Sequence, residues 1–210
     1  MPRWSAPASS AGNWERRRDV LNQAAVFLVE TILGLFSLAL LLRFYLQLVR
    51  APYRNPVSQF LCALTDFAVI PARRVVPGLW GMDLATLALA WLCEVLQLVV
   101  VLALRGMDAG AASGTVFVAI LVLPAIKILK MSIYILMVAV IVQAILSWVN
   151  PYSPIGPLLS SLTQPFLRPL QRRVPMVANV DLSPLVLIIA LQLILMVPVA
   201  WLEMSVARLF

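Results

Sequence analysis

Long apolar runs separated by short polar segments set the pattern of this chain. The first run covers about residues 24–42 and continues as helix to Leu48, the second covers 84–104, and the last begins at Asp181 and ends near Trp201. A hydrocarbon core about 30 Å thick needs about 20 mostly apolar residues for one helical crossing. Each of these runs is therefore predicted to span a membrane as an α-helix.

A further apolar run is interrupted only by Pro124, Lys127 and Lys130 and is too long for one straight crossing. A proline removes one backbone donor and often kinks a helix. The pattern therefore predicts a short approach segment over residues 115–126, followed by a third span over about 128–148.

A shorter amphipathic segment separates the two spans of the first half. It begins at Asn55-Pro56, where asparagine suits a helix cap and proline suits the first helical position. Its apolar residues follow at the spacing of one helix face: Phe60, Leu61, Leu64, Phe67 and Ala68. The segment is too short and too polar on its other face to cross a membrane, and Pro71 is expected to end it. We predict a helix that lies in the membrane interface or enters the membrane as a re-entrant element.

The segment from Leu64 to Asp83 returns at a constant spacing from Leu162 to Asp181. The matches pair Thr65 with Thr163, Pro71 with Pro169, Arg74 with Arg172 and Pro77 with Pro175. Ser153-Pro154 takes the place of Asn55-Pro56, and Pro165 and Pro169 are expected to break the second amphipathic helix. The chain is therefore predicted to be a duplication.

Each repeat consists of a span, an interfacial helix, a basic loop and a second span. Two crossings restore the starting direction, so the repeats should be parallel and related by a pseudo-twofold axis along the membrane normal. The predicted fold is an all-α membrane protein with four transmembrane helices. Its predicted organisation is a disordered basic tail over residues 1–19, a first repeat over 20–104, a polar turn over 105–114 and a second repeat over 115–210.

Composition places the chain among multi-spanning membrane proteins, because 62% of its residues are hydrophobic and only 12% are charged. The formal net charge is +7, but the arginines lie beside apolar spans and not on a soluble domain. Anionic phospholipids are therefore expected as partners, and nucleic acid is not.

Few residues suit catalysis. The chain has no histidine, and its two cysteines, Cys62 and Cys93, form no CxxC motif. This removes the common zinc, haem and histidine-based catalytic arrangements. The sequence also has no glycine-rich phosphate loop and no Ser/His/Asp set. We expect a protein that is not an enzyme and needs no cofactor or metal, with both cysteines acting as small apolar side chains.

Four charged residues lie within or beside the predicted spans: Glu30, Glu94, Lys127 and Lys130. An unpaired charge at the centre of a span costs at least about 2.5 kcal/mol. The repeat register places Lys130 opposite Glu30 and Gln192 opposite Glu94. We predict an intramembrane polar cluster in which Glu30 pairs with Lys130, and Glu94 with Gln192 or Lys127. Such a cluster fixes the packing of the repeats or forms a proton or ion pathway; the remaining alternative is lysines that snorkel to the headgroups beside a neutral Glu94.

The basic loops carry a second set of candidate residues: Arg73, Arg74, Arg168, Arg172 and Arg173. Guanidinium groups suit bidentate contact with phosphate, so these arginines are candidates for binding phospholipid headgroups or an acidic partner. The alternative is charge that sets the topology, with local bridges from Arg74 to Asp83 and from Arg172 to Asp181.

The other polar residues singled out at helix ends have predicted structural roles. The predicted helix caps are Asn55, Asp83, Ser153 and Asp181. Thr65 and Thr163 are predicted to form hydrogen bonds at helix termini.

Two blocks of the sequence resemble a known family. RFYLQLVR is followed by NPVSQF and IPARRVVP in the first half, and ILSWVNP is followed by SLTQPFLRPLQRRVP and VDLSPLVL in the second. These blocks are similar to the two signatures of the YggT family of bacterial and plastid integral membrane proteins, over roughly residues 24–201. Arg73 stands where the second block has Gln171, and Gln143 occupies a position that is often arginine in the family.

The resemblance implies a multi-pass protein of the bacterial inner membrane. Family members have been linked to envelope and cell-division processes, to osmotic or potassium tolerance and, in plastid relatives, to haem attachment to a membrane cytochrome. We therefore expect a scaffolding or assembly protein whose amphipathic helices and arginines engage lipids or other membrane or cell-division proteins, with a homo-oligomer as a further candidate assembly. The alternative is an ion-homeostasis component or minor transporter that uses the Glu/Lys cluster.

Overall fold

The computed structural model describes residues 11–50, 55–76, 82–106, 114–150, 152–173 and 181–208, and these are almost entirely helical. The elements are α1 (Ala11–Leu48), α2 (Pro56–Val75), α3 (Leu84–Leu104), α4 (Gly114–Val149), α5 (Gly156–Gln171), α6 (Ser183–Ile194), a π-helical turn η2 (Leu195–Val199) and α7 (Ala200–Ala207). The predicted all-α class is confirmed within these residues.

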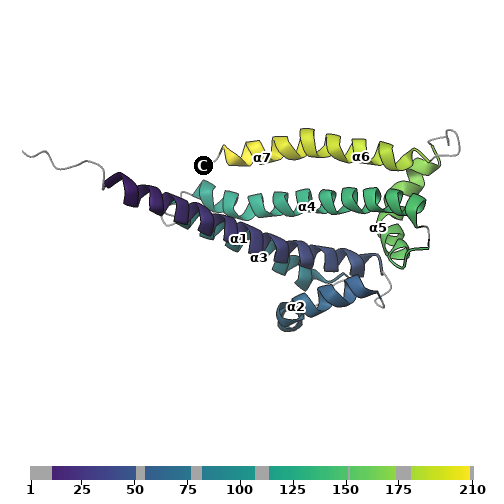
Figure 1. The fold of residues 1–210 in the computed structure, drawn as a ribbon, viewed down its shortest axis with the longest axis horizontal. Coiled ribbons are helices and arrows are strands. Elements are labelled where there is room, and N and C mark those ends of the chain that lie inside the picture. The colour runs from purple at the N-terminus through teal and green to yellow at the C-terminus, as the bar shows by residue number, and fades with distance from the viewer. Residues whose placement is uncertain are drawn as a thin grey trace, which may run out of the picture.

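Four stretches are long and apolar enough to cross a membrane: Arg17–Leu48, Leu84–Leu104, Phe117–Val149 and Ser183–Val206. α1 and α4 run in one direction, and α3 and the α6–α7 stretch run back beside them (Figure 1). α2 and α5 both lie toward the end of the bundle where α1 and α4 end. The two repeats are therefore parallel, as predicted, because two crossings return the chain to its starting side.

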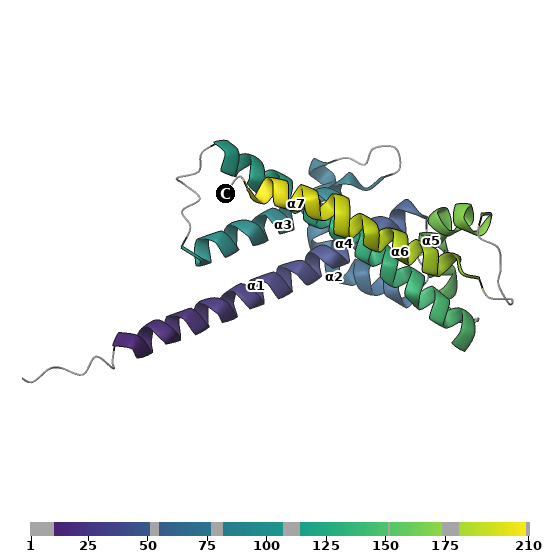
Figure 2. The same cartoon turned by 90° about the horizontal axis from the view of Figure 1, so that it is seen from above.

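The first helix begins earlier than expected. α1 starts at Ala11, so residues 11–19, expected within the disordered tail, are helical, while residues 1–10 lie outside the described part of the chain. Once a helix is nucleated in an apolar span, each added residue gains a backbone hydrogen bond, so helix propagates into the adjoining polar residues. Figure 2 shows that the N-terminal part of α1 projects away from α4 and α7.

The third apolar run is one continuous helix of 36 residues, and not an approach segment followed by a span. Pro124 lies inside this helix. An interrupted helix would expose unpaired backbone groups to lipid, so the helix continues through the proline. At about 1.5 Å per residue, α4 is longer than a hydrocarbon core of about 30 Å. Of the polar turn predicted before it, residues 107–113 lie outside the described part of the chain.

Neither amphipathic helix stops at its prolines, and this prediction is wrong. α2 continues through Pro71 to Val75, and α5 continues through Pro165 and Pro169. All three prolines are exposed. The carbonyl that loses its donor therefore lies on the outer side of each helix, where no packed neighbour opposes a small bend.

Small residues bring α1 and α3 together. Ser37 and Ala90 are fully buried, and the Ser37 hydroxyl donates to the Ala90 carbonyl oxygen at 3.5 Å. Gly34 also faces α3, since a Cβ at this position would lie 3.8 Å from Gln97 Oε1. Small side chains let two helix backbones approach closely. α1 and α3 accordingly make the most extensive interhelical contact of the described fold.

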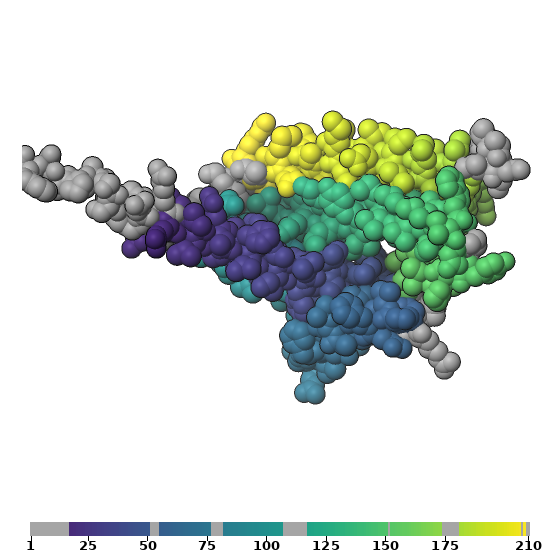
Figure 3. Space-filling model, viewed as in Figure 1, coloured from purple at the N-terminus to yellow at the C-terminus, as the bar shows by residue number. Residues whose placement is uncertain are grey.

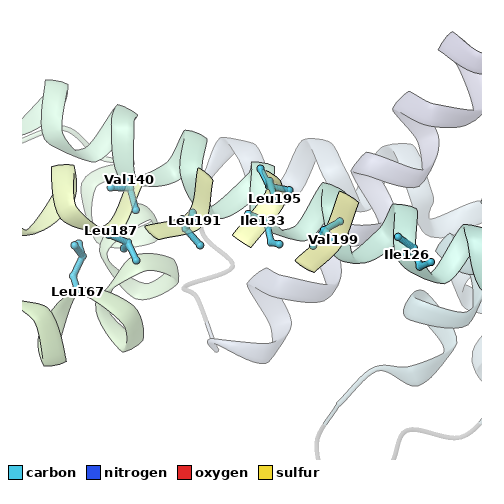
Figure 4. Close-up of a cluster of buried hydrophobic side chains, with 8 residues drawn as sticks. All are labelled: Ile126, Ile133, Val140, Leu167, Leu187, Leu191, Leu195 and Val199. Atoms are coloured by element: carbon cyan, nitrogen blue, oxygen red, sulfur yellow. The ribbon is translucent and has the colours of Figure 1, made fainter. Parts of the chain in front are cut away.

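The same positions carry large residues in the second repeat. Gly34, Ser37 and Ala90 correspond to Tyr134, Met137 and Ile188. Met137 and Ile188 pack against a row of buried side chains that joins α4, α5, α6 and η2, and Figure 4 shows this row along the α4–α6 boundary. The contact between α4 and α6 is less extensive than that between α1 and α3, as the larger side chains require.

α2 is held to the bundle by one face. Its buried residues include Leu61 and Thr65, whereas Phe60 and Phe67 of the predicted apolar stripe are 64% and 73% exposed. Figure 3 shows that α2 protrudes from the side of the bundle. An exposed apolar face on a protruding helix suits contact with lipid acyl chains.

α5 packs across the boundary between the repeats. Its residues Leu158 and Leu162 share a buried cluster with Ala39, Leu46 and Leu61 of the first repeat. α5 therefore contacts α1 as well as its own neighbours α4 and α6. The second amphipathic helix holds the two halves together at one end of the bundle.

Replacing Ser37 by leucine should destabilise the first repeat. The position is fully buried between α1 and α3, and overpacking of this kind costs about 1–3 kcal/mol. Met137→Leu, at the corresponding position of the second repeat, should change stability less, because the two side chains have similar volumes. Thermal unfolding of the detergent-solubilised protein, followed by circular dichroism, measures both effects. Equal midpoints for the two variants would contradict the difference in packing.

Candidate functional site

Charged side chains from four helices meet in a cavity of about 440 Å³ between α1, α3, α4 and α7. We call this cavity the charged chamber. Its charged residues are Glu30, Glu94, Lys127, Lys130 and Glu203, and its other polar residues are Gln97 and Tyr134. All of them lie in the four apolar stretches that are long enough to cross a membrane. Charges inside such stretches are costly and mark a candidate functional site.

Glu94 is the most deeply buried charge of the chamber. Its side chain is fully buried, and its Oε2 lies 2.6 Å from the Nζ of Lys127, whose side chain is 42% exposed. The contact is an ion pair whose angles do not fit a hydrogen bond. The other carboxylate oxygen, Oε1, has no donor among the described residues, and neither has the buried Oε1 of Gln97 one turn later on α3. The chamber thus contains two buried acceptor oxygens that no described side chain satisfies.

Lys130 pairs with Glu203 of α7, and not with Glu30 as predicted. The distance between Lys130 Nζ and Glu203 Oε2 is 2.8 Å, and both side chains are partly exposed. Glu203 reaches the chamber because the fourth stretch continues through η2, a π-helical turn that contains Pro198, into α7. A span that ends near Trp201, as predicted, would leave Glu203 outside it.

Of the five residues predicted for the polar cluster, Gln192 is the one that does not line the chamber. It is exposed on α6, and α6 contacts α4 and α5 but neither α1 nor α3. Glu94 therefore pairs with Lys127, one of the two predicted alternatives. Glu30 lines the chamber but makes no ion pair or hydrogen bond within the described part of the chain.

Three chamber residues, Gln97, Tyr134 and Glu203, were not among the predicted site residues. Helical spacing is a signal for two of them. Gln97 follows Glu94 by one turn, and Tyr134 follows Lys130 by one turn, so each shares a helix face with a predicted residue. Nothing in the spacing indicates Glu203, because its position depends on how far the last helix continues.

A second cavity of about 500 Å³ extends from Glu30 toward the N-terminal part of α1. We call it the vestibule. It is lined by Asp19, Asn22, Gln23, Val26, Phe27 and Glu30 of α1, and by Leu104 and Arg105 at the end of α3. Glu30 lines both cavities, so the vestibule and the chamber meet at this residue.

Matching polar contacts tie each amphipathic helix to the span before it. In the first repeat, the buried Arg43 donates from Nη1 to Thr65 Oγ1 and to Asp66 Oδ1, each at 2.7 Å. In the second repeat, the side-chain amide of Gln143 hydrogen-bonds with Thr163 Oγ1. Each threonine hydroxyl also bonds to the carbonyl one turn earlier in its own helix. The threonines therefore lie inside α2 and α5, and not at their termini as predicted, because the partner side chains meet these helices near the middle.

A second matching pair of contacts joins the end of each amphipathic helix to the start of the next span. Arg73 Nη2 donates to Asp83 Oδ2 at 2.6 Å, and Gln171 Nε2 donates to Asp181 Oδ2 at 2.8 Å. Arg73 and Gln171 occupy corresponding positions of the two repeats. The repeats thus keep the same contact with a charged donor in one copy and a neutral donor in the other.

The predicted bridges from Arg74 to Asp83 and from Arg172 to Asp181 are not among the ion pairs of the described residues. Successive helix residues point about 100° apart, so the residue before each of these arginines faces the aspartate instead. Arg74, Arg168, Arg172 and Arg173 are all exposed. Their lipid-binding role stays a prediction.

Three of the four predicted caps accept a backbone hydrogen bond at the start of a helix, but Leu182, and not Asp181, holds the N-cap position of α6. The pairs are Asn55 with Ser58 N, Asp83 with Thr86 N, and Asp181 with Ser183 N. Ser153 does not cap a helix through its side chain, and this prediction is wrong. α5 begins only at Gly156, after a turn in which the Gly156 amide donates to the Ser153 carbonyl oxygen.

The aspartates that precede α3 and α6 have lowered pKa values. Partial burial raises the pKa of Asp83, but donors from Arg73 and Thr86 outweigh it and hold this pKa below its usual value. For Asp181 the opposing donors come from Ser183 and Gln171. Because each folded-state pKa lies below the unfolded one, these contacts stabilise the fold above the unfolded pKa and lose that effect as the pH falls through the folded pKa.

Comparison with known proteins gives one family. The CCB3/YggT family model matches residues 22–104 and 122–202, which are the two repeats. An uncharacterized protein of Pseudomonas aeruginosa is 36% identical over 176 residues, covering 83% of this chain and 87% of that protein. The uncharacterized protein YggT of Escherichia coli K12 is 33% identical over 170 residues, covering 80% of this chain and 85% of that protein. No solved structure matches.

Replacing Lys127 by methionine should destabilise the protein, because the Glu94 carboxylate would stay buried without a cation. Removing one partner of a buried pair costs about 3–5 kcal/mol, and the partial exposure of Lys127 places the expected loss at or below the lower end. Adding Glu94→Gln to Lys127→Met should recover most of it, since a neutral amide needs no counter-ion. Thermal unfolding in detergent measures both variants. A single variant as stable as the original protein would show that this pair does not hold α3 to α4.

Arg43→Gln should destabilise the attachment of α2 by about 1–2 kcal/mol, because Asp66 and Thr65 lose a charged donor. Asp66→Gln should then restore part of the loss, since Gln164 stands at the position of Asp66 in the second repeat. A double-mutant cycle on unfolding midpoints measures the coupling. Strictly additive losses of stability in the two single variants would exclude a coupling between Arg43 and Asp66.

Proposed function

The chain belongs to the CCB3/YggT family, and on this premise we propose that it is a non-enzymatic scaffolding or assembly protein of the bacterial inner membrane. In this proposal the second repeat holds a transmembrane helix of a partner envelope protein. The observation that carries the proposal is an open groove between α4 and α6.

The groove has a volume of about 790 Å³. It is lined by residues 140–148 of α4, by residues 181–189 before and along α6, and by Leu167 and Gln171 of α5. We call it the second-repeat groove. The corresponding helices of the first repeat, α1 and α3, are drawn together by Gly34, Ser37 and Ala90, so the two repeats differ in how far their spans close.

The chemistry of the second-repeat groove suits a membrane helix. Its walls are mostly apolar, with Gln143 and Ser147 as polar groups on α4. Helices associate in membranes through close packing and interhelical hydrogen bonds, because lipid supplies no hydrophobic driving force between them. Leu185 and Ile189 are 57% and 53% exposed on the α6 wall, and a partner helix in the groove would cover them.

Anionic phospholipids have a supporting role in this proposal. Exposed arginines follow or end α2 and α5, which lie toward the same end of the bundle. Near an anionic membrane surface, each arginine contributes roughly 1 kcal/mol to the free energy of membrane binding. The exposed apolar face of α2 would contact acyl chains at that level. Together these features would seat the protein at one membrane surface while the groove stays open to a partner.

Ion homeostasis is a second candidate function, and the charged chamber is the observation that favours it. Ionisable groups inside membrane spans commonly mark ion or proton pathways. The chamber and the second-repeat groove have no lining residue in common. The two candidate functions can therefore be tested by separate substitutions.

A photo-crosslinking amino acid at Ile189 should capture a partner helix in living cells, whereas the same amino acid at Leu193 should not. Both positions are about equally exposed on α6, at 53% and 56%, but only Ile189 lines the groove. The expected product is a discrete adduct whose cross-linked peptide, identified by mass spectrometry, comes from a transmembrane segment of another protein. Ala144→Trp, which fills the groove from α4, should abolish it.

Equal capture at Ile189 and Leu193, or an adduct that survives Ala144→Trp, would contradict the groove as the binding site. An adduct between two copies of this chain would indicate a homo-oligomer and not a scaffold for another protein.

A further inference from the structure

The charged chamber has an excess of acceptor oxygens. Glu94 and Gln97 are 1% and 7% exposed, and the Oε1 atom of each has no donor within the described residues. Both side chains line the chamber from α3. A buried polar atom without a partner costs free energy, and a carboxylate oxygen costs more than an amide oxygen. These two oxygens therefore suit a cation or a hydrogen-bond donor, and not an anion.

The chamber also has one surplus negative charge. Its formal charges are three carboxylates, from Glu30, Glu94 and Glu203, and two ammonium groups, from Lys127 and Lys130. Two of the carboxylates are neutralised by the two lysines at 2.6 and 2.8 Å. Glu30 is the carboxylate that no described lysine or arginine pairs with. In a low-dielectric span, one monovalent cation would balance this charge, whereas a divalent ion would leave an excess positive charge beside Lys127.

Packing of α1 against α3 places Glu30 between these acceptors and the vestibule. Gly34 lies one turn after Glu30 on α1, and a Cβ at Gly34 would be 3.8 Å from Gln97 Oε1. Gln97 in turn lies one turn after Glu94 on α3. Because α3 runs antiparallel to α1, Glu30 and Glu94 lie on opposite sides of the Gly34–Gln97 contact, with Glu30 one turn nearer the vestibule and Glu94 one turn farther from it. Carboxylate and amide oxygen atoms are the usual ligands of hard cations.

The vestibule provides a polar route to this point. It meets the chamber at Glu30 and continues along α1 past Gln23 and Asn22 to Asp19, near the end of the apolar stretch that begins at Arg17. All four of these α1 residues carry side-chain oxygen atoms that can accompany a cation. Asp19 and Glu30 are negatively charged, and together they outweigh the one positive charge of Arg105 on the α3 side. In Figure 2, the N-terminal part of α1 diverges from the other helices. The vestibule is lined by this part of α1 and by Leu104 and Arg105 at the end of α3.

We propose that the charged chamber binds one monovalent cation at Glu94 and Gln97, that Glu30 balances its charge from the vestibule side of the chamber, and that the cation enters through the vestibule from the side of the N-terminal part of α1. The site lies in the boundary between α1 and α3, and Lys127 of α4 limits its charge. The cation site deepens the second candidate function, ion homeostasis, and rests on that function for any physiological role. The scaffold proposal does not depend on the cation site.

Cation binding is tested by thermal unfolding of the purified, detergent-solubilised protein in sodium chloride, potassium chloride or choline chloride at equal concentration. Sodium or potassium should raise the unfolding midpoint above that in choline chloride, because a ligand that binds only the folded state stabilises it by mass action. Glu30→Gln and Gln97→Leu should each remove this difference. Gln192→Leu is the matched control, because Gln192 is exposed on α6 and should leave the difference unchanged.

Equal midpoints in all three salts would overturn the cation site, and so would a salt difference that survives both Glu30→Gln and Gln97→Leu. Glu30 is exposed, so its glutamine variant is expected to fold even if the Gln97 variant does not. Sodium or potassium flux into vesicles that contain the protein is measured separately. Binding without flux would retain the site but reject the ion-homeostasis function.

The entry route is tested by cysteine labelling after Cys62→Ala and Cys93→Ala. A charged thiol reagent applied to membrane vesicles should modify Val26→Cys at least tenfold faster than Leu28→Cys. Val26 lines the vestibule, whereas Leu28 lies at nearly the same level, is 55% exposed and lines neither cavity. Equal rates at the two positions would show that the vestibule is not a route for ions.

Discussion

Close packing of α1 against α3 is the interaction on which the rest of the structure depends. It requires Gly34, Ser37 and Ala90, whose small side chains let the two backbones meet. Once α1 and α3 are joined, Glu94 and Gln97 are buried at their boundary, and Lys127 of α4 approaches to pair with Glu94. The first repeat therefore provides a rigid pair of helices against which α4, and through α4 the remaining spans, are placed.

The second repeat keeps the backbone plan of the first but changes the chemistry of its contacts. The donor to the aspartate that precedes the second span is Arg73 in one copy and Gln171 in the other, and the hydrogen-bond partner of the central threonine is Arg43 or Gln143. In both cases the contact survives while the charge is lost. The geometry of the contacts that attach the amphipathic helices is thus the same in both repeats. Charged contacts are retained where the first repeat meets α4 and α7.

This divergence gives the molecule two separate candidate sites. The second-repeat groove runs along α4 and α6, and its mostly apolar walls suit a helix. The charged chamber lies between the repeats, where no internal symmetry requires its residues to be duplicated. A scaffold and a cation site can coexist in such a fold, because each uses a different boundary between helices.

The features that could be predicted from the sequence are those that depend on residues close together along the chain. Apolar length and helical periodicity were sufficient for the four spans, the duplication and the caps at Asn55 and Asp83, because these depend on residues within about one or two turns. The predictions at Pro71 and Pro124 were wrong, because proline disfavours a helix only locally. At Pro124 lipid forbids an interrupted span, and Pro71 lies on the outer side of α2, where no packed neighbour opposes a small bend. The choice of ion-pair partners depended on tertiary structure. Repeat register placed Gln192 opposite Glu94, but α6 lies beyond α4 and contacts neither α1 nor α3. A sequence determines which residues share a helix face, whereas only the packed bundle decides which faces meet.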